Sequence, residues 1–210
     1  MNKISLIWDL DGTLIDSYET IVSSLYDTLL EYKLYIDKEN ILKHVKKESL
    51  GSFINAISNE YNLSADYIDK RAHELIFERQ YSIKPIQYAC ELLKQITNQN
   101  ISNYLYTHKN KSTYSILDNL DMSKYFSEIV TIENGFKRKP SPDAVNYLVQ
   151  KYNLNKKSTY YIGDRKLDIE CAYNAGIKSI LYLPKESYVT PTGKEDYIIE
   201  DLLEILDIIS

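Results

Sequence analysis

The sequence Trp8-Asp9-Leu10-Asp11-Gly12-Thr13-Leu14 places two carboxylates one residue apart, directly after a short apolar run, Ile4–Trp8. The apolar run predicts a buried strand. Carboxylates at the carboxyl end of such a strand lie in the crevice where open α/β sheets bind ligands. Two like charges this close need a cation or a proton to offset them, so the motif indicates a site for a charged ligand. A solvated acidic turn is the alternative, since Asp-Gly is a common turn pair.

Further short runs rich in β-branched and aromatic residues predict additional strands. They lie at Asn103–Tyr106, Ile129–Ile132, Thr159–Ile162, Ser179–Leu183 and Tyr197–Ile199. Helical patterns separate the later runs: one opens at Ser141-Pro142, and another covers Asp164–Ala175 and ends at Gly176. Because strands alternate with helices, we expect an α/β protein with a parallel sheet in a Rossmann-like, three-layer core.

Residues 16–81 interrupt this alternation, because their patterns are helical and contain no convincing strand. Amphipathic helices are expected at Ile21–Leu30, Ile54–Tyr61 and Ile68–Tyr81, and the polar stretch His44–Gly51 is expected to lie between helices. Lys84-Pro85 predicts the return to the core, with the proline in the first turn of a helix. The domain prediction is an α/β core of residues 1–15 and 82–210 and a helical insert of residues 16–81.

Composition excludes several classes of protein. The 210 residues carry 25 Lys+Arg and 30 Asp+Glu, and this mild acidic excess argues against a broad nucleic-acid surface. Apolar runs are far shorter than the ~20 residues that cross a bilayer, so no membrane association is expected. The first residues lack a cleavable signal, and Cys90 and Cys171 are too few and too far apart to suggest a metal or disulfide framework. These features favour a cytoplasmic protein. A monomer or a homodimer is expected.

Three more motifs follow the Asp-x-Asp pair in a set order. They are Thr107 after an apolar run, Lys139 in a Lys-Pro pair, and Gly163-Asp164 continuing to Asp168. With these motifs the sequence resembles the haloacid dehalogenase superfamily, whose first motif reads Asp-x-Asp-x-Thr. The resemblance spans nearly the whole chain. Four motifs in order are much more specific than a lone Asp-x-Asp.

The resemblance implies a Mg²⁺-dependent phosphatase that hydrolyses a small-molecule phosphomonoester, similar to phosphoglycolate phosphatases. Asp9 would attack phosphorus to form an aspartyl-phosphate, and Asp11 would act as general acid and base. The ligands of Mg²⁺ would be the Asp9 carboxylate, the Asp11 main-chain carbonyl and the Asp164 carboxylate. Asp168 would support the ion through water or an outer contact.

The same resemblance implies a phosphate-binding set. Thr107 and nearby main-chain N–H groups would hold phosphoryl oxygens, Lys139 would offset negative charge, and Gly12 would let the chain turn beside them. Lys137 or Arg138 is the alternative to Lys139, because the three form one basic run. His108 stands where relatives often have asparagine. It is expected to contact substrate or titrate near neutral pH, or else to be a plain loop histidine.

Asp11 separates the chemistries of this superfamily. Members that attack carbon lack this second acid, so its presence favours phosphoryl transfer over dehalogenation. Within that class, a sugar phosphomutase is the alternative, since mutases share the core motifs. A non-enzymatic phosphate-binding protein is a further alternative. In relatives with a helical insert at this position, the insert forms a cap that selects the leaving group. His44, Lys46, Lys47 and Ser49 are candidates to face the phosphate, and a solvent-facing loop is the alternative for each of them.

Overall fold

The computed structural model describes residues 3–210, which divide into two compact units. One unit joins the chain up to Asp16 with Lys84–Ser210, and the other comprises Ser17–Ile83. Within the described residues, no helix combines the length and the apolar character that crossing a membrane requires.

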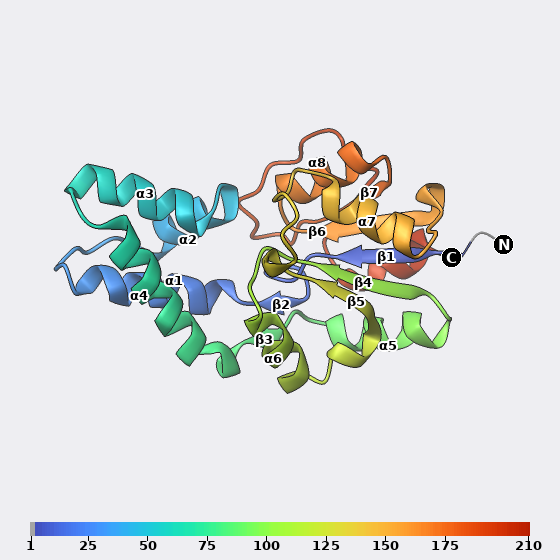
Figure 1. Ribbon diagram of the computed structural model, residues 1–210, viewed down its shortest axis with the longest axis horizontal. Coiled ribbons are helices and arrows are strands. Elements are labelled where there is room, and N and C mark those ends of the chain that lie inside the picture. The colour runs from blue at the N-terminus through green and yellow to red at the C-terminus, as the bar shows by residue number, and fades with distance from the viewer. Residues whose placement is uncertain (1–2) are drawn as a thin grey trace. The chain divides into compact units, whose positions relative to one another are not determined.

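The first unit is built on a six-stranded sheet with the strand order β5-β4-β1-β6-β7-β8 (Figure 1). All five neighbouring pairs are parallel. The strands are β1 (Ser5–Trp8), β4 (Ser102–Tyr106), β5 (Phe126–Val130), β6 (Thr159–Gly163), β7 (Lys178–Tyr182) and β8 (Tyr197–Ile199). The central strand β1 is fully buried, which explains its uninterrupted apolar run. The α/β prediction is therefore confirmed.

Helices flank both faces of this sheet and give the three expected layers (Figure 1). They are α5 (Ala89–Asn98), α6 (Ser112–Asn119), α7 (Asp143–Lys151), α8 (Lys166–Ala175) and the short α9 (Ile205–Ile208). On one face, apolar residues of α7 and α8 form a single core with the strands, in which Val145 and Ala172 pack with Ile7 and Tyr161. Gly176 ends α8 with a positive φ of 70°, as the sequence predicts.

The second unit contains four helices, α1 (Tyr18–Leu30), α2 (Lys38–Lys47), α3 (Leu50–Tyr61) and α4 (Ala65–Glu78). Polar side chains cap three of them: Asp37, Ser49 and Ser64 each accept a hydrogen bond from a main-chain N–H of the first turn. Their apolar faces meet in one core that includes Leu25, Ile41, Ile54 and Ile68.

Two sequence predictions about this unit are wrong. The polar break predicted at His44–Gly51 is limited to Glu48 and Ser49, because helix α2 runs to Lys47 and α3 begins at Leu50. Helix α2 buries only Ile41 and Val45, so its pattern is too polar to stand out in the sequence. Helix α4 ends at Glu78, and Tyr81 lies in the following 3₁₀ turn.

Two predictions about the core also need correction. Lys84–Pro85 is strand β3, which pairs antiparallel with β2 (Ile15–Asp16) and does not begin a helix. Proline has no N–H to donate, and it is tolerated in β3 because this strand is the edge of a two-stranded sheet. The third predicted strand ends at Val130, since Ile132 belongs to a 3₁₀ turn that the Thr131–Asn134 capping box closes.

Candidate active site

Asp9 directly follows β1 and is almost completely buried. Its main-chain N–H donates to the carbonyl of Ile162 on β6 at 2.8 Å, which extends the parallel pairing by one residue. The chain then turns sharply: Gly12 has a φ of 82°, in the left-handed region, and its N–H donates to the carbonyl of Ile15 at 2.8 Å. The turn therefore explains Gly12, and a phosphate contact by this residue stays a prediction.

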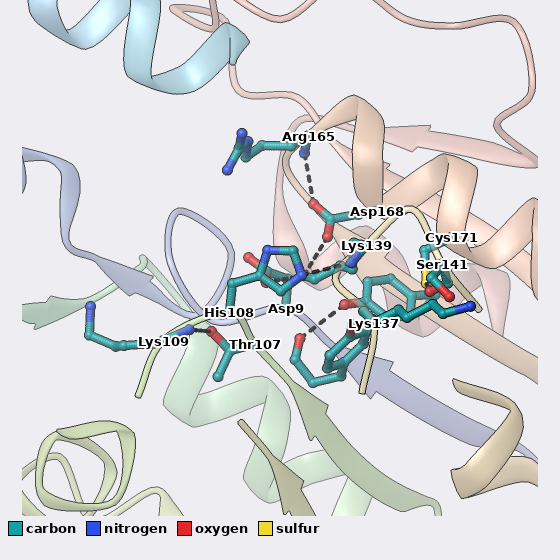
Figure 2. A network of polar contacts seen from close by, with 12 residues as sticks. Asp9, Thr107, His108, Lys109, Lys137, Lys139, Ser141, Arg165, Asp168 and Cys171 are labelled. Atoms are coloured by element: carbon teal, nitrogen blue, oxygen red, sulfur yellow. Dashed lines mark hydrogen bonds and ion pairs between the residues drawn. The ribbon is translucent and has the colours of Figure 1, made fainter. Parts of the chain in front are cut away.

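The other motif residues converge on Asp9 because the carboxyl ends of parallel strands share one edge of the sheet. Thr107 follows β4, Asp164 follows β6, and Asp168 lies in the first turn of α8. Lys139 comes from the long loop between β5 and α7. Thr107, Lys139, Asp164 and Asp168 are all buried, and Figure 2 shows Lys139 between Asp9 and Asp168.

The Lys139 ammonium is the centre of this cluster. Its Nζ lies 2.5 Å from Asp9 Oδ1 and 2.6 Å from Asp168 Oδ1. The rings of Tyr106 and Tyr161 flank it, with centroids 5.1 Å and 5.4 Å from Nζ. Its neighbours Lys137 and Arg138 are exposed, so Lys139 is the member of the basic run that reaches Asp9.

Burial and charge act in opposite directions on Asp9. Desolvation raises its pKa from the usual 3.8 to about 7, while the attraction of Lys139 works to lower it. The two carboxylates hold the pKa of Lys139 well above its usual value despite burial, so this side chain stays charged. Stabilising Asp9 as a carboxylate at neutral pH therefore requires more positive charge than Lys139 alone supplies.

Three carboxylates are close enough to share a cation. Oxygens of Asp9, Asp164 and Asp168, one from each residue, all lie within 4.8 Å of one another, and all three residues are buried. The Lys139 ammonium pairs with Asp9 and Asp168, so these two carboxylates carry one more negative charge than Lys139 offsets when both are ionised. The donor set fits a hard divalent cation such as Mg²⁺, which prefers carboxylate oxygens.

Lys109 is a residue of this site that the sequence reasoning missed. Its Nζ lies 3.0 Å from Asp11 Oδ1, and its side chain is only 10% exposed. Its N–H donates to Thr107 Oγ1 at 3.1 Å, which ties it to the second motif. The only signal in the sequence is a lysine two residues after the motif threonine, at a strand end expected to face Asp9.

His108 lies within this loop and is mostly buried. Its Nε2 accepts a hydrogen bond from the main-chain N–H of Lys139 at 2.8 Å. Burial, followed by the charges of Lys139, Arg138 and Arg165, lowers the pKa of His108 to about 3. The expectation that it titrates near neutral pH is therefore wrong, and the ring is neutral under ordinary conditions.

A sequence profile described as "Haloacid dehalogenase-like hydrolase" matches residues 6–182. The chain belongs to this family. A pyrophosphatase PpaX from Oceanobacillus iheyensis is 29% identical to it over 212 residues, covering 100% of this chain and 98% of that protein. A phosphoglycolate phosphatase from Vibrio parahaemolyticus is 25% identical and covers 98% of this chain and 95% of its own length.

Solved structures agree with the fold of this family member. A "predicted phosphoglycolate phosphatase" from Haemophilus somnus has a TM-score of 0.88 at 21% identity, covering 100% of this chain and 99% of that one. A hydrolase from Streptococcus pneumoniae has a TM-score of 0.67 at 29% identity, covering 99% and 100%. The expected enzyme class is confirmed: the protein is a phosphatase-type hydrolase of the haloacid dehalogenase family.

Gly163 is required in this family member because Asp168 lies against it. A Cβ placed on Gly163 would lie 2.4 Å from Asp168 Cβ, far inside contact distance. We expect Gly163→Ala to displace Asp168 from Lys139, destabilising the fold by about 1–3 kcal/mol. Urea unfolding measures this loss, and Gly51→Ala is the control, since nothing lies within 4 Å of its Cβ position. Equal stability of Gly163→Ala and the wild type would contradict this packing.

His108 predicts a pH effect on stability. Its pKa is about 3 in the folded protein, below its usual 6.5, so the unfolded chain binds a proton first as pH falls. This residue therefore costs the wild type stability progressively below about pH 6.5, and it costs nothing above that pH. When pH falls from about 6.5 to about 4, the unfolding free energy of the wild type should decrease by about 1–2 kcal/mol more than that of His108→Asn. Parallel stability–pH curves for the two proteins would contradict the buried neutral ring.

Proposed function

We propose that this protein is a Mg²⁺-dependent phosphatase that hydrolyses a small-molecule phosphate ester through an aspartyl-phosphate on Asp9. The observation that carries the proposal is the buried cluster of Asp9, Lys139 and Asp168 at the carboxyl edge of the sheet. A buried carboxylate held by an ammonium, with a second acid two residues away on the same turn, suits nucleophilic attack and proton transfer.

In the first proposed step, an Asp9 carboxylate oxygen bonds to phosphorus while the bond from phosphorus to the ester oxygen breaks. Asp11 gives its proton to the departing alkoxide. In the second step, Asp11 takes a proton from water as the water oxygen bonds to phosphorus. The bond between Asp9 and phosphorus then breaks, which releases inorganic phosphate and restores both carboxyl groups. Lys139 offsets negative charge in both steps.

Lys109 gives Asp11 a defined position for this work. Its contact with Asp11 Oδ1 fixes this carboxyl group on the turn that also carries Asp9. The Thr107 hydroxyl, which accepts a hydrogen bond from the Lys109 N–H, keeps its own proton available for a phosphoryl oxygen.

Asp9, Asp164 and the Asp11 carbonyl would hold Mg²⁺, with Asp168 supporting the site. The ion, when bound, neutralises charge on the phosphoryl group and makes phosphorus easier to attack. The three buried carboxylates, whose oxygens lie within 4.8 Å of one another, support a divalent ion. The relatives named as pyrophosphatase and phosphoglycolate phosphatase support a small anionic substrate. Because these relatives are named as hydrolases, a phosphomutase is not favoured.

The helical unit Ser17–Ile83 is proposed as the cap that selects the leaving group. Its support is its place in the sequence, between the first strand and the remainder of the core. A cap excludes water from the first chemical step and recognises the leaving group by shape and charge.

The proposal is tested by phosphate release from a panel of sugar phosphates, phosphoglycolate, pyrophosphate and p-nitrophenyl phosphate, with and without Mg²⁺. We expect release only with the metal. Asp164→Ala should raise the Mg²⁺ concentration for half-maximal activity by about 10–100-fold, because a carboxylate ligand is lost. Asp143→Ala is the matched control, since this acid lies at the start of α7 and outside the cluster. An unchanged Mg²⁺ titration for Asp164→Ala would refute the assigned ligand.

A further inference from the structure

Arg165 lies between Asp164 and Asp168 in the sequence, and the proposed chemistry gives its side chain no role. It follows Asp164 and precedes α8, and its main-chain N–H donates to Asp168 Oδ2 at 3.1 Å. Its guanidinium takes no part in that bond. Nε and Nη2 of Arg165 are buried and find no hydrogen-bond partner among the described residues.

Arg165 is half-buried as a residue, but these two buried N–H-bearing nitrogens without an acceptor are costly, and native proteins rarely keep such atoms unless another molecule supplies the acceptor. Both carboxylate oxygens of Asp168 already accept hydrogen bonds, Oδ1 from Lys139 and Oδ2 from the main-chain N–H of Arg165. The fork of an arginine matches the two oxygens of a carboxylate or phosphate group. The guanidinium is therefore shaped for an anion from outside the chain.

His108 offers a second donor near this guanidinium. Because His108 Nε2 accepts the Lys139 N–H, the proton of the neutral ring is on Nδ1, which makes Nδ1–H a donor on the other side of the ring. The positive charge of Arg165 is close enough to act on the ring. In the view of Figure 2, the guanidinium and the His108 ring both lie to the left of Asp168, the guanidinium above it and the ring below it.

These donors also belong to the two loops that carry proposed ligands of the metal and the phosphoryl group. Arg165 is adjacent in sequence to Asp164, whose carboxylate oxygen is within 4.8 Å of an oxygen of Asp9. His108 is adjacent to Thr107, the proposed phosphoryl ligand. An anion held by Arg165 and His108 would thus belong to the same substrate as the phosphoryl group on Asp9.

We infer that Arg165 and the Nδ1–H of His108 form a subsite for a second anionic group, so the preferred substrates carry a carboxylate or phosphate on the leaving group. This inference rests on the proposed phosphatase function and narrows its substrate class. The shared chemistry is a compact oxyanion next to the scissile bond, as in a diphosphate or a phosphorylated hydroxy acid.

Binding tests the subsite without turnover. Calorimetry with Mg²⁺ compares methylenediphosphonate, which carries two anionic groups, with methylphosphonate, which carries one. We expect Arg165→Met to lower the ratio of the two affinities by about 10–100-fold, because a charge-assisted contact is lost only for the first ligand. Arg165→Lys, which keeps the charge without the fork, should fall between Arg165→Met and the wild type.

Arg138→Met is the matched control, because Arg138 is an exposed arginine whose charge also acts on His108. It should leave the affinity ratio within about twofold of the wild type. If Arg138→Met and Arg165→Met lower the ratio equally, or if neither does, the subsite is refuted. An equal fall would mean that the positive charge of either arginine acts at long range, without a specific contact to the second anion.

Kinetics separates the subsite from the proposed function and identifies the source of the anion. The ratio of kcat/KM for pyrophosphate or phosphoglycolate to kcat/KM for p-nitrophenyl phosphate should fall at least about tenfold in Arg165→Met. A fall for only one of the two substrates shows which oxyanion the subsite takes. Turnover by the wild type with no change in either ratio overturns the subsite alone. Selective binding of methylenediphosphonate with no turnover of any ester supports the subsite and overturns the phosphatase.

Discussion

Replacing Lys139 with methionine is expected to cost about 3–5 kcal/mol of unfolding free energy and to abolish phosphate release. The ammonium is buried and contacts both Asp9 and Asp168. Methionine has a similar length but no charge, so two carboxylates would stay buried without their shared partner. Breaking a buried ion pair on one side is much more costly than losing a surface pair.

The sign of the pH dependence makes this result specific. The pKa of Asp9 is about 7 in the folded wild type, above its unfolded value near 3.8, so ionising this group already costs stability as pH rises through that interval. Removing the ammonium that lowers this pKa must raise it further. The stability difference between the wild type and Lys139→Met should therefore be larger at about pH 8 than at about pH 5.

Urea unfolding at the two pH values measures the difference. Lys137→Met is the matched control, since Lys137 is the exposed lysine two residues earlier, and it should change the unfolding free energy by less than about 0.5 kcal/mol. A stability difference between the wild type and Lys139→Met that is no larger at about pH 8 than at about pH 5 would show that the charge of Lys139 does not hold the two carboxylates.

The position of the site at the carboxyl edge of the sheet could be predicted from the sequence, because it follows from the parallel topology alone. Parallel strands bring their carboxyl ends to one edge, so acids after β1 and β6 and a threonine after β4 had to meet. Lys139 was selected within its basic run by its Lys-Pro pair. The structure adds the physical reason, because the residue is buried between two tyrosine rings while its neighbours are exposed.

Other features depend on loop geometry that the sequence does not encode locally. The ion pair of Lys109 with Asp11 joins residues 98 positions apart, and a lysine in a loop gives no periodic signal. The neutral state of His108 depends first on burial and then on three neighbouring cations, which only the folded chain brings together. The β2–β3 pair is too short for a pattern, and its proline suggested a helix start. Each of these errors lies in a connection and none lies in a central strand.

Replacing Asp9 with asparagine is expected to reduce phosphate release by at least ~10⁴-fold while leaving the fold intact. The amide has the same shape as the carboxylate, and its oxygen can still accept a hydrogen bond from Lys139, so the cluster keeps its geometry. An amide oxygen is a much poorer nucleophile than a carboxylate, which removes the first step of the proposed mechanism.

The matched control is Asp16→Asn, because Asp16 is an exposed acid in strand β2 of the same unit. It should keep activity within about twofold of the wild type. Mass spectrometry of acid-quenched enzyme after brief exposure to substrate provides a readout besides turnover. The wild type should carry one acid-stable phosphoryl group on the peptide that contains Asp9, and Asp9→Asn should carry none.

The two readouts together decide which residue is the nucleophile. Loss of turnover together with loss of the phosphoryl group means that Asp9 itself is phosphorylated. The variant keeps the shape of the site and lacks only the carboxylate of residue 9. If Asp9→Asn is inactive yet still becomes phosphorylated, another residue accepts the group, and Asp9 serves only to hold Lys139. Activity within about tenfold of the wild type would mean that attack on phosphorus needs no carboxylate at this position.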